Sequence, residues 1–132
     1  MTDTLQTKIN QVNALLEKGE PDNVSEDPYT HYKGYSPQAT VDAVNEVFGL
    51  DGWGFEDIDN SFFDKNENGK PKLAIASVKV WVSGKECYRT AYGQGRITRS
   101  DYGDAKKSAQ TDALKKAFSY FSIGKRAYLG KL

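Results

Sequence analysis

The last third of the chain most constrains its possible folds. A strand-like segment there ends at Gly93-Gln94-Gly95, and residues 101–122 then show the residue spacing of a long helix. Ala117 and Phe118 lie on one side of that helix, and Lys115 lies near the centre of the opposite side. The pattern therefore predicts a helix whose apolar side packs on a sheet and whose cationic side faces away from its own core.

A regular alternation in residues 73–82 predicts the central strand of that sheet. We expect one partner strand over residues 53–63, reached through a loop that contains the turn-forming pair Asn68-Gly69. A second partner strand is expected over residues 86–96, reached through Ser83-Gly84. The three strands should form an antiparallel meander. The predicted core face of the central strand consists of Ala74, Ala76, Val78, Val80 and Val82.

The first half of the chain predicts two further helices. Apolar residues recur at helical spacing from Leu5 to Leu16, and Gly19 ends that segment. Ser36-Pro37 supplies an N-cap and a first-turn proline for a second helix, which should end near Gly49 and pack on the sheet. Residues 20–29 contain two prolines and four acidic side chains, so we expect a linker or an extended arm there.

The expected fold class is α+β, with a three-stranded or slightly larger antiparallel meander packed against helices in the order α-α-β-β-β-α. We place an N-terminal helix and acidic arm in residues 1–30 and a single domain in residues 31–132. No apolar run approaches the roughly 18 residues of a membrane span, and the first residues lack the features of a secretory signal. We therefore expect a cytoplasmic protein without membrane association. The single cysteine, Cys87, excludes an internal disulfide.

The available side chains argue against most catalytic chemistries. Zinc needs about three or four protein ligands, whereas the chain has one histidine, His31, and one cysteine. Gly93-Gln94-Gly95 lacks the Lys-Ser/Thr of a phosphate-binding loop, so we interpret it as a turn or bulge and expect no use of ATP. We expect no enzyme activity, no metal and no cofactor. One alternative stays open, a Mg²⁺-dependent nuclease built on Asp57, Asp59 and Asp64.

The formal net charge of zero hides two oppositely charged halves. Residues 1–64 hold 3 basic and 13 acidic side chains, a net charge of −10, and residues 65–132 hold 15 and 5, a net charge of +10. Basic side chains interleaved with aromatic rings predict a nucleic-acid surface, because cations hold phosphates and rings stack on unpaired bases. The basic positions are Lys79, Arg89, Arg96, Arg99, Lys106, Lys107, Lys115 and Lys116, and the rings are Trp81, Tyr88, Tyr92 and Tyr102.

Several segments between about residues 30 and 130 form a recognisable pattern. They are Tyr35-Ser36-Pro37, residues 45–53, Tyr92-Gly93-Gln94-Gly95, residues 105–118 and Phe121-x-Ile123-Gly124. In order and spacing they resemble the Rad52 family of single-strand annealing proteins, and within that family the chain looks close to the bacterial DdrA-like and phage branches.

The resemblance implies a single-stranded DNA-binding protein of DNA repair and recombination, associated with the nucleoid, that anneals complementary strands without ATP on a homo-oligomeric ring. A recombinase or a single-strand binding protein is an implied partner. By position, Lys115 matches the family's groove lysine, Lys116 matches the adjacent basic residue, and Lys70 matches a residue of an outer DNA site. Arg96 and Arg99 lie loosely where the family carries another outer-site lysine.

Two positions depart from the family pattern. Ser119 stands where eukaryotic members carry a basic residue, and the groove arginine before the second helix has no counterpart in residues 23–31. Lys33 or His31 could substitute for that arginine, or Arg89 and Arg96 could support Lys115 instead. The predicted DNA-binding residues are Lys33, Lys70, Lys79, Arg89, Arg96, Arg99, Lys107, Lys115 and Lys116.

Two binding alternatives remain beside the nuclease. A double-stranded RNA module shares the order of three strands followed by a lysine-bearing helix, although the first helix and the spacer here are long for that class. A protein-interaction module would use the two oppositely charged halves for assembly alone. Preference for duplex RNA in competition would favour the former, and absence of DNA affinity at low salt would favour the latter.

Overall fold

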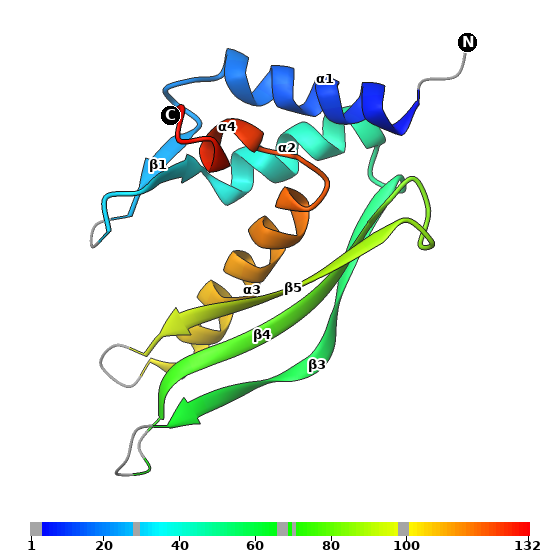
Figure 1. Cartoon of the computed structure of the whole chain (residues 1–132). Helices are drawn as coiled ribbons and strands as arrows, with labels where there is room; N and C mark the ends of the chain where they lie inside the picture. The colour runs from blue at the N-terminus through cyan, green and yellow to red at the C-terminus, as the bar shows by residue number, and fades with distance from the viewer. Residues whose placement is uncertain (1–3, 28–29, 66–68, 70, 98–100) are drawn as a thin grey trace.

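The computed structural model describes residues 4–27, 30–65, 69, 71–97 and 101–132. A layer of helices lies at one end of a long, twisted sheet, and a further helix runs along one face of that sheet (Figure 1). The elements in chain order are α1 (Leu5–Lys18), β1 (Val24–Glu26), β2 (Lys33–Tyr35), α2 (Pro37–Phe48), β3 (Trp53–Lys65), β4 (Pro71–Val82), β5 (Tyr88–Arg96), α3 (Tyr102–Ser119) and α4 (Lys125–Tyr128).

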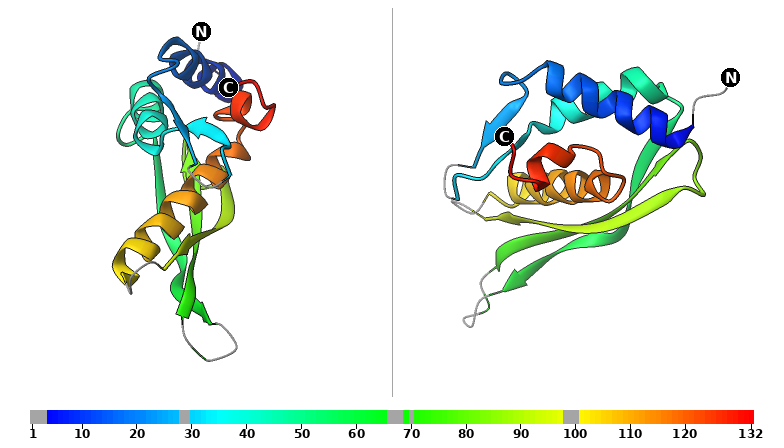
Figure 2. Two further views of the ribbon diagram at one scale, coloured as in Figure 1. Left: turned by 90° about the vertical axis from the view of Figure 1, so that its left-hand side faces the viewer. Right: turned by 45° about the horizontal axis from the view of Figure 1, so that its top comes forward.

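The predicted α+β meander is confirmed. Strands β3, β4 and β5 form an antiparallel sheet in chain order, and Ser83 and Gly84, both with positive φ, form the turn between the last two strands. The predicted apolar face of β4 is buried beneath α3, while the other face of the sheet is not covered by any helix in the described residues (Figure 2). That open face carries the exposed rings of Tyr88 and Tyr92.

Very close packing of α3 on β5 explains the glycine pair. Gly93 and Gly95 lie inside β5, so the prediction of a turn or bulge there was wrong. A Cβ atom at Gly93 would lie 2.3 Å from the Ala109 carbonyl oxygen, and one at Gly95 would lie 2.2 Å from the Ala105 carbonyl oxygen. The buried stripe of α3 is made of alanines at four-residue spacing, which lets the helix and strand backbones meet.

Polar contacts fix α3 across the sheet. The Gln94 backbone N–H in β5 donates to Asp112 at 3.1 Å, and the Gln110 side chain donates to the Asp57 carboxylate in β3 at 3.1 Å. The helix is therefore held at both edges of the sheet, and its N-cap is Asp101, as the acidic start of the segment suggested. This fixes the direction in which the lysines of α3 point.

The two N-terminal helices form as predicted, with one difference in packing. Ser36 caps α2 by accepting from the Ala39 N–H at 3.2 Å, and Gly19 and Gly49 end the two helices. The second helix packs mainly on α1, and its main contact with the sheet is at β3, because α3 covers most of that sheet face. Val12 of α1 lies in the same buried cluster as the central strand. The division of the chain after residue 30 stays a prediction.

The acidic segment contributes a short hairpin that the sequence did not predict. Val24–Glu26 pairs antiparallel with Lys33–Tyr35, so this part is a paired strand rather than a free arm. The Tyr35 hydroxyl donates to Glu20 at 3.2 Å, and the Arg126 guanidinium of α4 donates to the same carboxylate at 3.3 Å. These contacts join the hairpin to α4.

The chain leaves α3 through a turn that α1 holds in place. Ser122 and Gly124 have positive φ angles of 67° and 79°. The buried Asn13 side chain of α1 donates to the Ser122 carbonyl at 2.9 Å and accepts from the Gly124 N–H at 2.7 Å. The buried Gly124 N–H is thereby satisfied, and the turn is tied to α1 by two hydrogen bonds. Across the described part of the chain, no helix is long and apolar enough to span a membrane.

Candidate nucleic-acid interface

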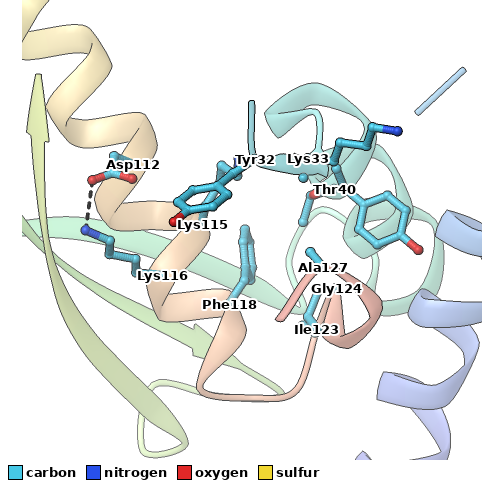
Figure 3. Close-up of a pocket in the computed structure, with 12 residues that line it drawn as sticks. Tyr32, Lys33, Thr40, Asp112, Lys115, Lys116, Phe118, Ile123, Gly124 and Ala127 are labelled. Atoms are coloured by element: carbon cyan, nitrogen blue, oxygen red, sulfur yellow. Dashed lines mark ion pairs between the residues drawn. The ribbon is translucent and has the colours of Figure 1, made fainter. Parts of the chain in front are cut away.

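A cleft of about 290 Å³ opens between α3, the β1–β2 hairpin and α4 (Figure 3). Its lining comes from segments far apart in the sequence, which the hairpin and the α3–α4 turn bring together. The lining residues are Tyr32, Lys33, Gly34, Tyr35, Thr40, Asp112, Lys115, Lys116, Phe118, Ile123, Gly124 and Ala127.

The cleft combines an apolar floor with cationic rims. Phe118 and Ile123 are fully buried and form part of the floor. Lys115 is half-buried, and its ammonium lies 3.3 Å from the point that a Cβ atom at Gly34 would occupy. The glycine in β2 thus lets the lysine of α3 approach the opposite wall. As predicted, Lys115 points off the helix's own core, and it points into this cleft.

Lys116 stands beside Lys115 but is already paired. Its ammonium contacts the Asp112 carboxylate at 3.0 Å, and Asp112 also accepts from the Gln94 N–H (Figure 3). An exposed ion pair of this kind contributes roughly 0.3–0.5 kcal/mol, so a phosphate can compete for the lysine. Lys33, Lys115 and Lys116 outnumber this one carboxylate, and the cleft favours an anion.

A shallower depression extends the cleft along α3. It shares Asp112 and Lys115 with the cleft and reaches Lys107 and Pro37 at its other end. Lys107 and Lys115 are eight positions apart, which is about 12 Å along the helix axis. The predicted residues Lys107, Lys115 and Lys116 therefore lie along one track.

The β1–β2 hairpin supplies the opposite rim. Of the two candidates for the missing groove arginine, Lys33 lines the cleft, although its side chain extends away from α3 in Figure 3, and His31 does not line it. Tyr32, which our sequence reasoning missed, also lines the cleft and is exposed. The available signal was an aromatic residue beside Lys33 in a polar segment just after the predicted arm.

The other predicted residues lie elsewhere. The Arg89 guanidinium stacks 4.7 Å from the Phe121 ring centre, and the Lys79 ammonium lies 4.4 Å from the Tyr88 ring centre on the open sheet face. Arg96 is exposed at the end of β5. The structure thus separates these three residues from the cleft lysines. Lys70 and Arg99 lie outside the described residues.

The acidic residues of β3 do not form the expected pattern. The nuclease alternative required Asp57 and Asp59 to share one face of β3, as alternate residues of a regular strand do. A register shift instead pairs them with Val78 and Ser77, adjacent residues of β4. The described residues contain no group of three or more histidine, cysteine, aspartate or glutamate side chains placed to hold a metal. Cys87 is half-buried in the turn before β5 rather than within the strand.

The chain is similar in sequence to known DNA repair proteins. Residues 8–130 match the Rad52/22 family of double-strand break repair proteins. The chain is 36% identical over 99 residues to the DNA repair and recombination protein rad22 of Schizosaccharomyces pombe, covering 67% of this chain and 21% of that protein. It is 38% identical over 90 residues to the DNA repair and recombination protein radC of Emericella nidulans, covering 61% and 15%. The chain therefore spans about a fifth or less of these relatives.

Proposed function

Because the chain belongs to the Rad52/22 family of double-strand break repair proteins, we propose that it binds single-stranded DNA and anneals complementary strands without ATP. The observation that carries the proposal is the track of Lys107, Lys115 and Lys116 beside a cleft with an apolar floor. Cations spaced along a rigid helix suit the phosphates of a single strand, because they need not follow the geometry of a duplex.

Annealing requires a strand to be held without its bases being read. In this proposal the lysines of α3 contact the phosphates, and the Watson–Crick edges of the bases stay open to a second strand. Base pairing itself then supplies the free energy, so the protein acts by binding and aligning the strands, and no covalent bond is made or broken. The open sheet face with Lys79, Tyr88 and Tyr92 is a second surface for a strand.

We further propose that the protein works as a homo-oligomeric ring. Rings need a heterologous interface, in which one patch meets a different patch on the neighbour, and the acidic and basic halves of the chain are complementary in charge. Light scattering should give a mass of several subunits at micromolar concentration, and a mass near 14.7 kDa would contradict the ring. A recombinase or single-strand binding partner, a nucleoid-associated location and membership of the DdrA-like or phage branch remain our predictions.

A competition experiment separates the proposal from its alternatives. A labelled single-stranded DNA oligonucleotide is bound in the presence of EDTA and challenged with unlabelled single-stranded DNA or with duplex RNA. The proposal predicts that single strands compete better and that the labelled strand stays intact. Better competition by duplex RNA would favour the RNA-binding alternative. Cleavage that appears only when Mg²⁺ is restored would favour the nuclease.

A further inference from the structure

Tyr32 is the one aromatic side chain on the rim of the cleft whose ring is almost fully in solvent. It is 78% exposed, more than Tyr92 on the sheet face, and yet it lines the same cleft as Lys115. Figure 3 shows its ring directed from the hairpin side toward α3, in the direction of Lys115. We infer that Tyr32 is a base-stacking residue for a nucleotide held in the cleft, an inference that rests on the proposed single-stranded DNA binding.

The backbone at Tyr32 is fixed although its ring is free. The Tyr32 carbonyl accepts from the Asp27 N–H at 2.9 Å, and the Tyr32 N–H donates to the Thr30 hydroxyl at 3.2 Å. Thr30 is held in turn by the Asp27 carboxylate, which accepts from its N–H at 3.0 Å. The hairpin thus presents the ring from a defined position, so little backbone freedom is lost when a ligand binds.

Other rings in the described part of the chain have a cation over one face. For example, Tyr88 lies under Lys79, and Trp81 lies under Lys85. No ring or cation contact of this kind involves Tyr32 among the described residues. With the residue 78% exposed, ring surface is available to a flat ligand.

The two walls of the cleft match the two parts of a nucleotide. Lys115 and Lys116 on α3 supply positive charge for a phosphate, and the Tyr32 ring on the hairpin supplies a flat apolar surface for a base. Stacking on an aromatic side chain contributes about 5- to 150-fold in affinity per base, and it tolerates any sequence. It also occupies the flat face of the base and leaves the Watson–Crick edge free, as annealing requires.

Oligonucleotides with and without bases test this inference. Anisotropy titrations compare a labelled oligothymidine with an abasic oligonucleotide of the same length, for the wild type, Tyr32→Ala, Tyr32→Phe, Tyr92→Ala and Tyr120→Ala. We expect Tyr32→Ala to weaken oligothymidine binding at least 5-fold, and to leave abasic binding within about 2-fold. Tyr32→Phe should bind like the wild type. Tyr92→Ala tests the competing sheet face. Tyr120→Ala is the control and should leave both titrations unchanged, because Tyr120 is 58% exposed and does not line the cleft.

The possible failures are distinguishable. Equal binding of oligothymidine by Tyr32→Ala and the wild type would overturn the stacking role and leave the proposed function intact. An equal loss on both oligonucleotides would also overturn it, because the loss would not depend on bases. If only Tyr92→Ala weakened oligothymidine binding, base stacking would be assigned to the open sheet face and not to Tyr32. Absence of binding to either oligonucleotide by the wild type would overturn the proposed function, and the inference with it.

Discussion

At the scale of single residues, the position of Lys115 decides whether the cleft can hold a phosphate. Lys115→Ala should weaken single-stranded DNA binding and lower the slope of log affinity against log salt by about 0.7, the share of one phosphate contact on a single strand. The fold should be unchanged because the ammonium faces the cleft, away from the core of α3. Anisotropy titrations between about 50 and 200 mM salt measure both quantities.

Lys85→Ala is the matched control for this variant. Lys85 is exposed in the turn before β5, where its ammonium lies 5.3 Å from the Trp81 ring centre, and it does not line the cleft. Lys85→Ala changes the net charge of the protein by the same amount as Lys115→Ala. If the two variants reduce affinity and slope equally, general charge rather than a phosphate site at Lys115 explains the binding.

Helical periodicity predicted the direction of Lys115 but not its surroundings. The spacing of apolar residues in 101–122 establishes which side of the helix faces the core, and Lys115 lies off that side as expected. Nothing in that spacing indicates what lies opposite. The residues opposite are Tyr32, Lys33 and Gly34, some 80 positions earlier, and only the fold brings them within reach.

Tyr35 should make stability fall in alkaline solution. Burial, together with the adjacent Glu20 carboxylate, raises the pKa of Tyr35 from 10.0 to about 12. Between these two pH values the unfolded chain loses the Tyr35 proton while the folded chain keeps it, so the free energy of unfolding decreases as the pH rises. Two pKa units correspond to a loss of about 2–3 kcal/mol. Below pH 10 the full contribution remains.

The Tyr35→Phe variant lacks this titrating group. Comparing it with the wild type therefore separates the effect of Tyr35 from that of the other titrating groups. Urea denaturation at pH 9, 10 and 11 should show the wild type approaching the stability of the variant as the pH rises. Because the ring is 4% exposed and Phe keeps its shape, packing should change little. Parallel pH profiles for the two proteins would show that Tyr35 is not stabilised in its protonated form by the fold.

At the scale of elements, the approach of α3 to β5 depends on the absence of a side chain at Gly93. Gly93→Ala would place a Cβ atom 2.2 Å from the Ala113 backbone nitrogen, so the helix must move away from the strand. We expect a loss of stability of about 1–3 kcal/mol or more, seen as a lower melting temperature. Loss of DNA binding should accompany it, because the helix carries the lysine track.

Gly103→Ala provides the comparison on the same helix. Gly103 lies in the first turn of α3, and the nearest atom to an added Cβ is 3.9 Å away. Alanine favours a helix over glycine by roughly 0.8–1.0 kcal/mol in a helix interior, so this variant should be neutral or more stable. A Gly93→Ala protein that melts at the wild-type temperature would refute the close packing.

The elements differ in how far their sequences predicted them. The meander and the capped helices were predicted because alternation, the Ser83-Gly84 turn and Ser36-Pro37 are local signals. The β1–β2 hairpin was not, because three-residue strands cannot show a period and its pairing is fixed by contacts with α4 through Glu20. The Gly93-x-Gly95 pattern was misread because its cause is a helix later in the chain.

At the scale of the whole molecule, the fold separates the predicted cationic residues. Lys33, Lys107, Lys115 and Lys116 line the cleft or its extension along α3, whereas Lys79 lies on the open face of the sheet and Arg89 packs against Phe121. Residues of both the acidic and the basic half line the cleft, so the boundary between them runs through the proposed site. A strand bound as we propose would lie between the lysines of α3 and a hairpin that belongs to the acidic half.

The rate at which two complementary labelled DNA oligonucleotides anneal, without ATP or metal, tests the central claim most directly. The protein should accelerate formation of the duplex and release it uncut, and Lys115→Ala should accelerate it less than Lys85→Ala does. No acceleration at protein concentrations that saturate the single strands would contradict annealing and leave only strand binding.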